Sequence, residues 1–116
     1  IRVSLFMDSD PTTVGAAAGV GADRIEIYTE PYAEAFGTTN QGAMTESCAA
    51  CADEAERAGL GVNAGHDLNL ENLPTLCHRV SNLLEVSIGH ALIADALEFG
   101  LHATVKAYLE ALAPSH

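Results

Sequence analysis

Tryptophan is absent from this chain of 116 residues, and basic residues are scarce. Lys and Arg number 5 against 16 Asp and Glu, which gives a formal net charge of -11. Nucleic-acid binding needs basic side chains clustered on one face. The five basic residues are instead scattered along the sequence, at Arg2, Arg24, Arg57, Arg79 and Lys106. We therefore expect no nucleic-acid partner.

Long hydrophobic runs are also missing. No stretch approaches the roughly 18 consecutive apolar residues of a membrane-spanning helix, and no signal-peptide pattern is present. Hydrophobic residues still make up 48% of the chain, enough to bury a core. These features predict a cytoplasmic protein with no membrane partner.

Cysteine is sparse, with three residues at Cys48, Cys51 and Cys77. The first two form a C-x-x-C pair inside ESCAACADEAERAG, a helical pattern of small residues with no second ligand pair nearby. Zinc and redox sites need a better framework than this. We interpret the cysteines as packing residues and expect neither a metal nor a cofactor.

Four β-rich runs alternate with helical patterns, which predicts an α/β fold with a parallel sheet. The strands are expected at residues 2–7, 24–28, from 61, and at 83–88. Helices are expected at residues 12–20 (capped by Asp10 with Pro11 first), 44–58 (capped by Thr45 and stopped by Gly59), near Pro74, from about residue 90, and at 101–112. Residues 29–42 are polar and glycine-rich, so we expect a loop there with one helical turn at most.

The stretch GVNAGHDL, residues 61–68, is typical of a buried strand that ends in a functional loop. Gly65 permits a sharp turn or a close approach, and His66 can exchange a proton near neutral pH. Glu26 lies between two isoleucines and faces either solvent or a barrel interior. If it faces the same pocket, His66 and Glu26 could act together as acid and base. Alternatively, His66 is simply held by the loop at Asp67.

A second strand end, Ile88-Gly89-His90-Ala91, leads directly into a helix. The free N–H groups of such a turn suit a phosphate, although a plain strand-to-helix turn has the same pattern. A metal site built from histidines and carboxylates is disfavoured, because no pair has helical i, i+4 spacing.

Four segments in this order and spacing resemble the C-terminal half of the pyridoxine 5'-phosphate synthase family: RVSLFMD, GADRIEIYTEPYA, GLGVNAGHDLNLENLP and VSIGHALIADALEFGL. The resemblance implies a TIM (β/α)8 barrel, of which residues 1–116 are the C-terminal four βα units of a single domain. It also implies an enzyme that condenses 3-amino-2-oxopropyl phosphate with 1-deoxy-D-xylulose 5-phosphate, giving pyridoxine 5'-phosphate, phosphate and water. The start at Ile1, without methionine and directly before a strand, adds to the expectation of a fragment.

Site roles follow from the same resemblance. It implies that His66 is the catalytic proton donor and that Glu26 stabilises a charged transition state. Asp67, Gly89 and His90 would bind the amino-ketone phosphate, largely through backbone N–H groups. Some family members have glycine where this chain has Asp67, so we expect that carboxylate to point away from the phosphate.

Half a barrel lacks the catalytic groups of the other half, so we expect no turnover by this chain alone. Its two unpaired sheet edges predict a homo-oligomer. The sequence leaves two alternatives to the enzyme. One is a non-catalytic half barrel that binds sugar phosphates. The other is a receiver-like, doubly wound signalling domain, although the only lysine, Lys106, falls in the last predicted helix rather than at a strand end.

Overall fold

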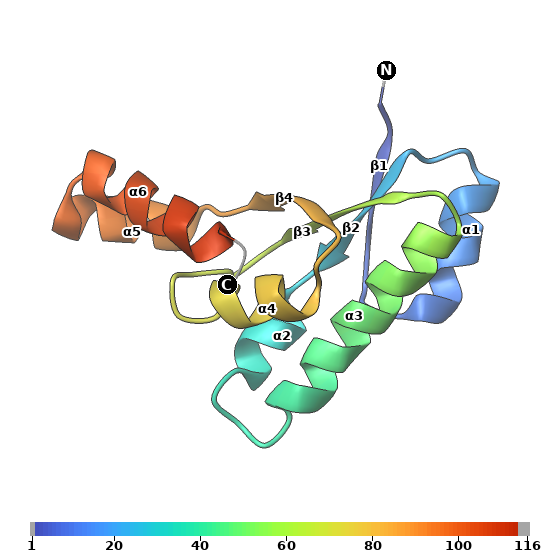
Figure 1. Cartoon of the computed structure of the whole chain (residues 1–116), viewed down its shortest axis with the longest axis horizontal. Helices are drawn as coiled ribbons and strands as arrows, with labels where there is room; N and C mark the ends of the chain where they lie inside the picture. Colours follow the sequence, from blue (N-terminus) through green and yellow to red (C-terminus); the bar gives the residue numbers. More distant parts are fainter. Residues whose placement is uncertain (1, 114–116) are drawn as a thin grey trace.

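The computed structural model describes residues 2–113, so Ile1, on which part of the fragment expectation rested, lies outside the described residues. One parallel sheet has its strands in the order β1-β2-β3-β4 (Figure 1). The strands are β1 (Ser4–Met7), β2 (Arg24–Tyr28), β3 (Gly61–Gly65) and β4 (Leu83–Ser87). The four predicted strands and their parallel pairing are confirmed.

Helices fill every connection between the strands. They are η1 (Pro11–Thr13), a 3-10 turn, and the α-helices α1 (Val14–Gly19), α2 (Glu30–Ala35), α3 (Gln41–Arg57), α4 (Leu73–Arg79), α5 (His90–Phe99) and α6 (Leu101–Leu112). This βα alternation shows the predicted α/β class.

The two faces of the sheet differ sharply. Ile25, Ile27 and Val62 are at most 1% exposed and pack against apolar residues of α1, α3 and α4. Glu26 and Tyr28 alternate with the isoleucines and are only partly buried, so they belong to the opposite face. A doubly wound sheet reverses its strand order and carries helices on both faces. The sequential order and single helix-covered face therefore make the receiver-like alternative wrong, while they match four units of a barrel wall.

Several predicted helix limits need correction. The first helix divides into η1 and α1, and Asp10 caps η1 as predicted, because its carboxylate accepts the Thr12 N–H at 3.0 Å. Helix α3 begins at Gln41 rather than Met44. Thr45 does not cap it, since its hydroxyl donates to the Gln41 carbonyl within the helix at 2.7 Å. Gly59 ends the helix region with φ 80°, as predicted.

The prediction for residues 29–42 is confirmed in part. The helical turn allowed there forms as α2, and its Tyr32 and Ala35 are buried against the rest of the fold. Only a tight turn remains before α3, closed by a hydrogen bond from the Gly37 N–H to the Gln41 side-chain carbonyl at 2.9 Å. Burial of an aromatic ring outweighed the polar and glycine-rich composition of this segment.

The cysteines of α3 are packing residues, as predicted. Cys48 is 1% exposed and Cys51 is fully buried within the core. Burial raises the pKa of each thiol from 9.0 to about 11. Both thiols therefore stay protonated near neutral pH and are poor nucleophiles and poor metal ligands.

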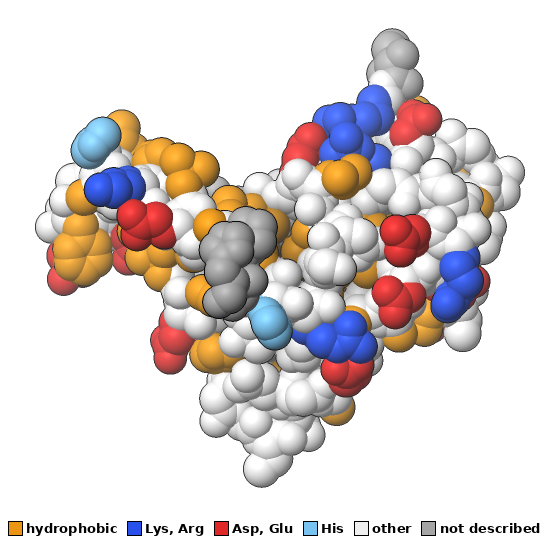
Figure 2. Space-filling model, viewed as in Figure 1, with side chains coloured by type: hydrophobic (Ala, Val, Ile, Leu, Met, Phe, Trp, Pro, Cys, Tyr) orange, Lys and Arg blue, Asp and Glu red, His pale blue; other side chains and the backbone are white. Residues whose placement is uncertain are grey.

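The hairpin of α5 and α6 extends from the end of β4 (Figure 1), while α6 also contacts α4 and buries Tyr108 in the core. Helix α5 buries no residue fully, and hydrophobic side chains gather over the hairpin surface (Figure 2). Its exposed large hydrophobic residues are Ile93, Leu97, Phe99, Leu101, Val105 and Leu109. Over the described residues, no helix has the length and apolar character needed to cross a membrane.

Candidate active site

A hollow of about 560 Å³ lies at the carboxyl ends of β3 and β4. Its lining includes all five residues singled out from the sequence: Glu26, His66, Asp67, Gly89 and His90. They come from β2, from the loop after β3 and from the start of α5. Parallel α/β folds bind ligands at this end of the sheet. The structure therefore assembles the predicted residues in one place, whereas Asp8, which follows β1, is not part of the lining.

Glu26 lies in the middle of β2 rather than at its end, in register with Phe6 on one side and Asn63 on the other. Its carboxylate reaches over Gly65 of the neighbouring strand. A Cβ added at Gly65 would lie 3.0 Å from Glu26 Oε2 and 3.1 Å from the Ser87 Cβ. Gly65 therefore permits a close approach, as the sequence allowed. The group that lies close to it is the Glu26 carboxylate.

His66 and Asp67 both have positive φ angles, 107° and 58°. Residues other than glycine rarely adopt this left-handed region, and aspartate tolerates it better than most. Strand β3 continues to Gly65, so the loop starts at His66. Strained backbone of this kind is often found where a side chain must be aimed at a ligand.

Buried polar side chains hold the backbone of this loop. The Thr29 hydroxyl donates to the His66 carbonyl at 2.7 Å, and the Asn72 amide donates to the Asp67 carbonyl at 3.2 Å. Thr29 is fully buried and Asn72 is 2% exposed. Sequence reasoning assigned neither residue a role. The N-x-x-N spacing of Asn69 and Asn72 was the available signal, since such side chains cap turns through backbone N–H groups.

Tyr32 supports the same loop from α2. Its hydroxyl donates to the Asn72 carbonyl at 2.5 Å. Burial raises the pKa of Tyr32 to about 12, so the phenol keeps the proton that this hydrogen bond requires. A residue of α2 thus supports the loop that follows β3.

Aromatic rings flank the histidine on the open face of the sheet. The Tyr28 ring centroid lies 5.0 Å from that of His66, and Phe6 lies 5.2 Å from Tyr28. Both distances fall in the range of favourable aromatic pairs. Neither ring was singled out from the sequence, because contacts between neighbouring strands depend on register.

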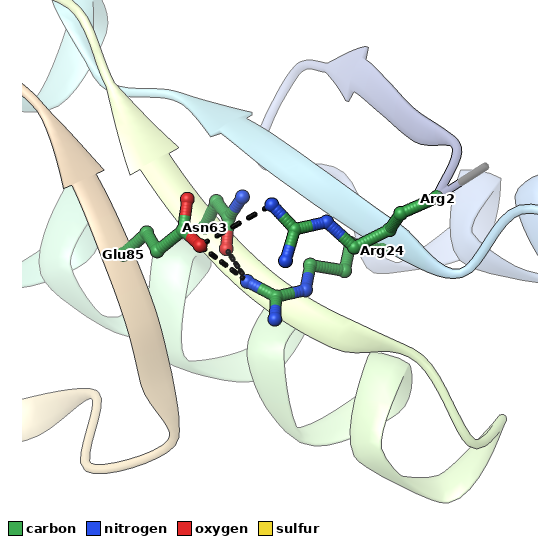
Figure 3. A network of polar contacts seen from close by, with 4 residues as sticks. All are labelled: Arg2, Arg24, Asn63 and Glu85. Atoms are coloured by element: carbon green, nitrogen blue, oxygen red, sulfur yellow. Dashed lines mark hydrogen bonds and ion pairs between the residues drawn. The ribbon is translucent and has the colours of Figure 1, made fainter.

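A second polar group on the open face joins Arg24, at the start of β2, to Asn63 and Glu85 in the middle of β3 and β4 (Figure 3). Glu85 of β4 accepts hydrogen bonds from Arg24 at 3.1 Å and from Arg2 at 3.3 Å, and Arg24 also donates to Asn63 at 3.1 Å. Glu85 is half exposed, so each ion pair contributes little stability. The group links β2, β3 and β4 and is not part of the hollow.

The arrangement can hold an anion and move a proton. The first N–H groups of α5 lack acceptors within the helix, and Gly89 and His90 at this helix start line the hollow. His66 and Glu26 both line the hollow, as an acid–base pair would require. Among residues 2–113, no three His, Cys, Asp or Glu side chains come close enough together to hold a metal ion.

Comparison with known proteins gives this geometry a family. The family model described as "Pyridoxal phosphate biosynthesis protein PdxJ" matches residues 1–114. The chain belongs to the PdxJ family. The resemblance seen in the sequence motifs is thereby confirmed.

Several curated relatives of this family are named pyridoxine 5'-phosphate synthase. The protein of Albidiferax ferrireducens is 58% identical over 113 residues, which are 97% of this chain and 45% of the relative. That of Porphyromonas gingivalis is 51% identical over 97% of this chain and 47% of the relative. A Xanthomonas campestris pv. campestris protein is 52% identical over 97% of this chain and 44% of the relative. The chain therefore spans about half the length of these PdxJ relatives.

Proposed function

We propose that this chain forms the C-terminal half of a pyridoxine 5'-phosphate synthase, a cytoplasmic TIM-barrel enzyme that needs no metal or cofactor. The reaction, taken from the family resemblance, joins 3-amino-2-oxopropyl phosphate to 1-deoxy-D-xylulose 5-phosphate and closes the pyridine ring. One observation carries the proposal above the others. Five residues from three separate segments, all expected from the family motifs, line one hollow.

Each residue has a role that its position allows. His66 donates a proton in the ring-forming steps, and Glu26 stabilises positive charge that develops beside it. Gly89, His90 and the backbone at Asp67 bind the phosphate of the amino-ketone. The Asp67 carboxylate would repel a phosphate, and we expect it to point away. The hollow, about 560 Å³, is large enough for a small phosphorylated ligand.

The test is a chimera in which this chain replaces the matching half of the Albidiferax ferrireducens synthase. We expect the chimera to form pyridoxine 5'-phosphate from the two substrates and the 116-residue chain alone to form none, because the chain supplies only half of the barrel wall. The unaltered relative serves as the control. A folded chimera without activity would contradict the proposed function, and turnover by the isolated chain would contradict the need for a second half.

A non-catalytic half barrel that binds sugar phosphates remains the alternative. The turn at Gly89, which suits a phosphate, supports this alternative as much as it supports the enzyme. The chimera separates the two, since a binding protein would not restore the condensation.

Exposed apolar surface predicts how the isolated chain associates. The α5–α6 hairpin and the open sheet face, where Phe6 is 56% exposed and Leu84 59% exposed, need a covering layer. We expect the chain alone to form homo-oligomers that bury these surfaces and pair the edges of β1 and β4. Light scattering measures the molar mass, and a clean monomer would show this expectation to be wrong.

A further inference from the structure

We propose that Thr29 is a positioning residue for His66. Its buried hydroxyl holds the His66 carbonyl and so keeps the histidine backbone in the conformation that directs the ring into the hollow. This inference rests on the proposed function, because it assigns Thr29 to the same site.

Both polar donors of Thr29, its backbone N–H and its hydroxyl, are hydrogen-bonded to carbonyls of the neighbouring segment. The Thr29 N–H donates to the Gly65 carbonyl at 3.0 Å, and the Thr29 hydroxyl donates to the next carbonyl along, that of His66, at 2.7 Å. One residue thus fixes both carbonyls that flank the bend from β3 into the loop. Since Thr29 is fully buried, water cannot take over either bond.

The residue held in this way is the strained one. His66 has φ 107°, a value that costs free energy unless the surroundings impose it. The Asn72 side chain holds the following carbonyl, that of Asp67, through a longer bond of 3.2 Å. Thr29 therefore makes the only side-chain contact to the His66 carbonyl among the hydrogen bonds of the described residues.

Thr29→Val removes the hydroxyl at nearly constant volume, whereas Thr29→Ser keeps it. In the chimera we expect Thr29→Val to lower kcat about tenfold with KM changed less than about twofold, and Thr29→Ser to restore kcat to within about twofold. Thr45→Val is the matched control. Thr45 is 7% exposed and its hydroxyl also donates to a carbonyl at 2.7 Å, but within α3 and away from the hollow.

A crystal structure of the 116-residue chain with Thr29→Val gives a readout that does not need activity. We expect His66 to leave the left-handed region in that structure and to keep it in the Thr45→Val structure. If the valine chain does not fold, Thr29→Ala removes the same hydroxyl without adding a methyl group.

The outcomes separate the two proposals. An inactive but folded chimera would count against the proposed function, while the backbone of His66 would still decide the role of Thr29. A Thr29→Val protein with an unchanged His66 φ and unchanged kcat would overturn the inference. An equal loss of kcat in the Thr45→Val chimera would also overturn it, because the effect would then reflect stability and not position.

Discussion

Replacing His66 with asparagine is expected to lower kcat of the chimera by roughly 10²–10⁴-fold, the usual contribution of a general acid or base. Asparagine adopts positive φ more readily than most residues, so the backbone at φ 107° should survive the change. KM should change little, because the phosphate contacts proposed at Gly89 and His90 remain. Steady-state kinetics with both substrates measures the effect.

Exposed histidines elsewhere provide the control for this substitution. His78 lies on α4 and His102 on α6, both exposed and both outside the hollow. Asparagine at either position should leave kcat within about twofold, as expected for a surface change away from any special feature. If His66→Asn behaves like these controls, His66 is not the proton donor.

Glu26→Gln is the second large effect that we expect, with kcat lower by roughly 10²–10³-fold, as when a preorganised charge-stabilising group is removed. Glutamine keeps the size of the side chain and removes its charge. The fold should therefore persist, and circular dichroism should show an unchanged helix content. Glu56→Gln, an exposed change on α3, is the control.

Gly65→Ala tests the same carboxylate without removing it. The new Cβ would lie 3.0 Å from Glu26 Oε2 and 3.1 Å from the Ser87 Cβ, so the carboxylate or Ser87 must shift slightly. We expect kcat to fall with the charge retained, whereas Gly42→Ala in α3, where a Cβ meets nothing within 4 Å, should have no such effect. Full activity in both the Glu26→Gln and the Gly65→Ala chimera would exclude a catalytic role for Glu26.

The sequence predicted the elements whose signals are local. Alternation in RIEIY predicted β2, and Pro11 and Pro74 marked helix starts that the structure confirms. The motifs GVNAGHDL and IGHA pointed to the residues that line the hollow. Such patterns succeed because a strand end followed by Gly and His is a short-range feature.

Other features could not be predicted from the sequence, because they depend on residues far away in the chain. The burial of Tyr32 in α2 could not be predicted, because it depends on a contact with Asn72, forty residues further along the chain. Thr45 had the right chemistry for a cap but lies inside α3. The contacts of Thr29 and Tyr28 with His66 had no local signal, because each residue meets His66 only when β2 and β3 pair.

By itself, then, the sequence determined the α/β class, the parallel strands, the acidic character that disfavours nucleic acid, and the family motifs with His66 and Glu26. Tertiary structure alone decided which face of the sheet Glu26 occupies, that Gly65 leaves room for its carboxylate, and that His66 sits on strained backbone held by a buried hydroxyl. The physical reason is the range of the interactions. Hydrophobic periodicity and capping act over a few residues, whereas the site is built from strand register and buried hydrogen bonds between segments distant in sequence.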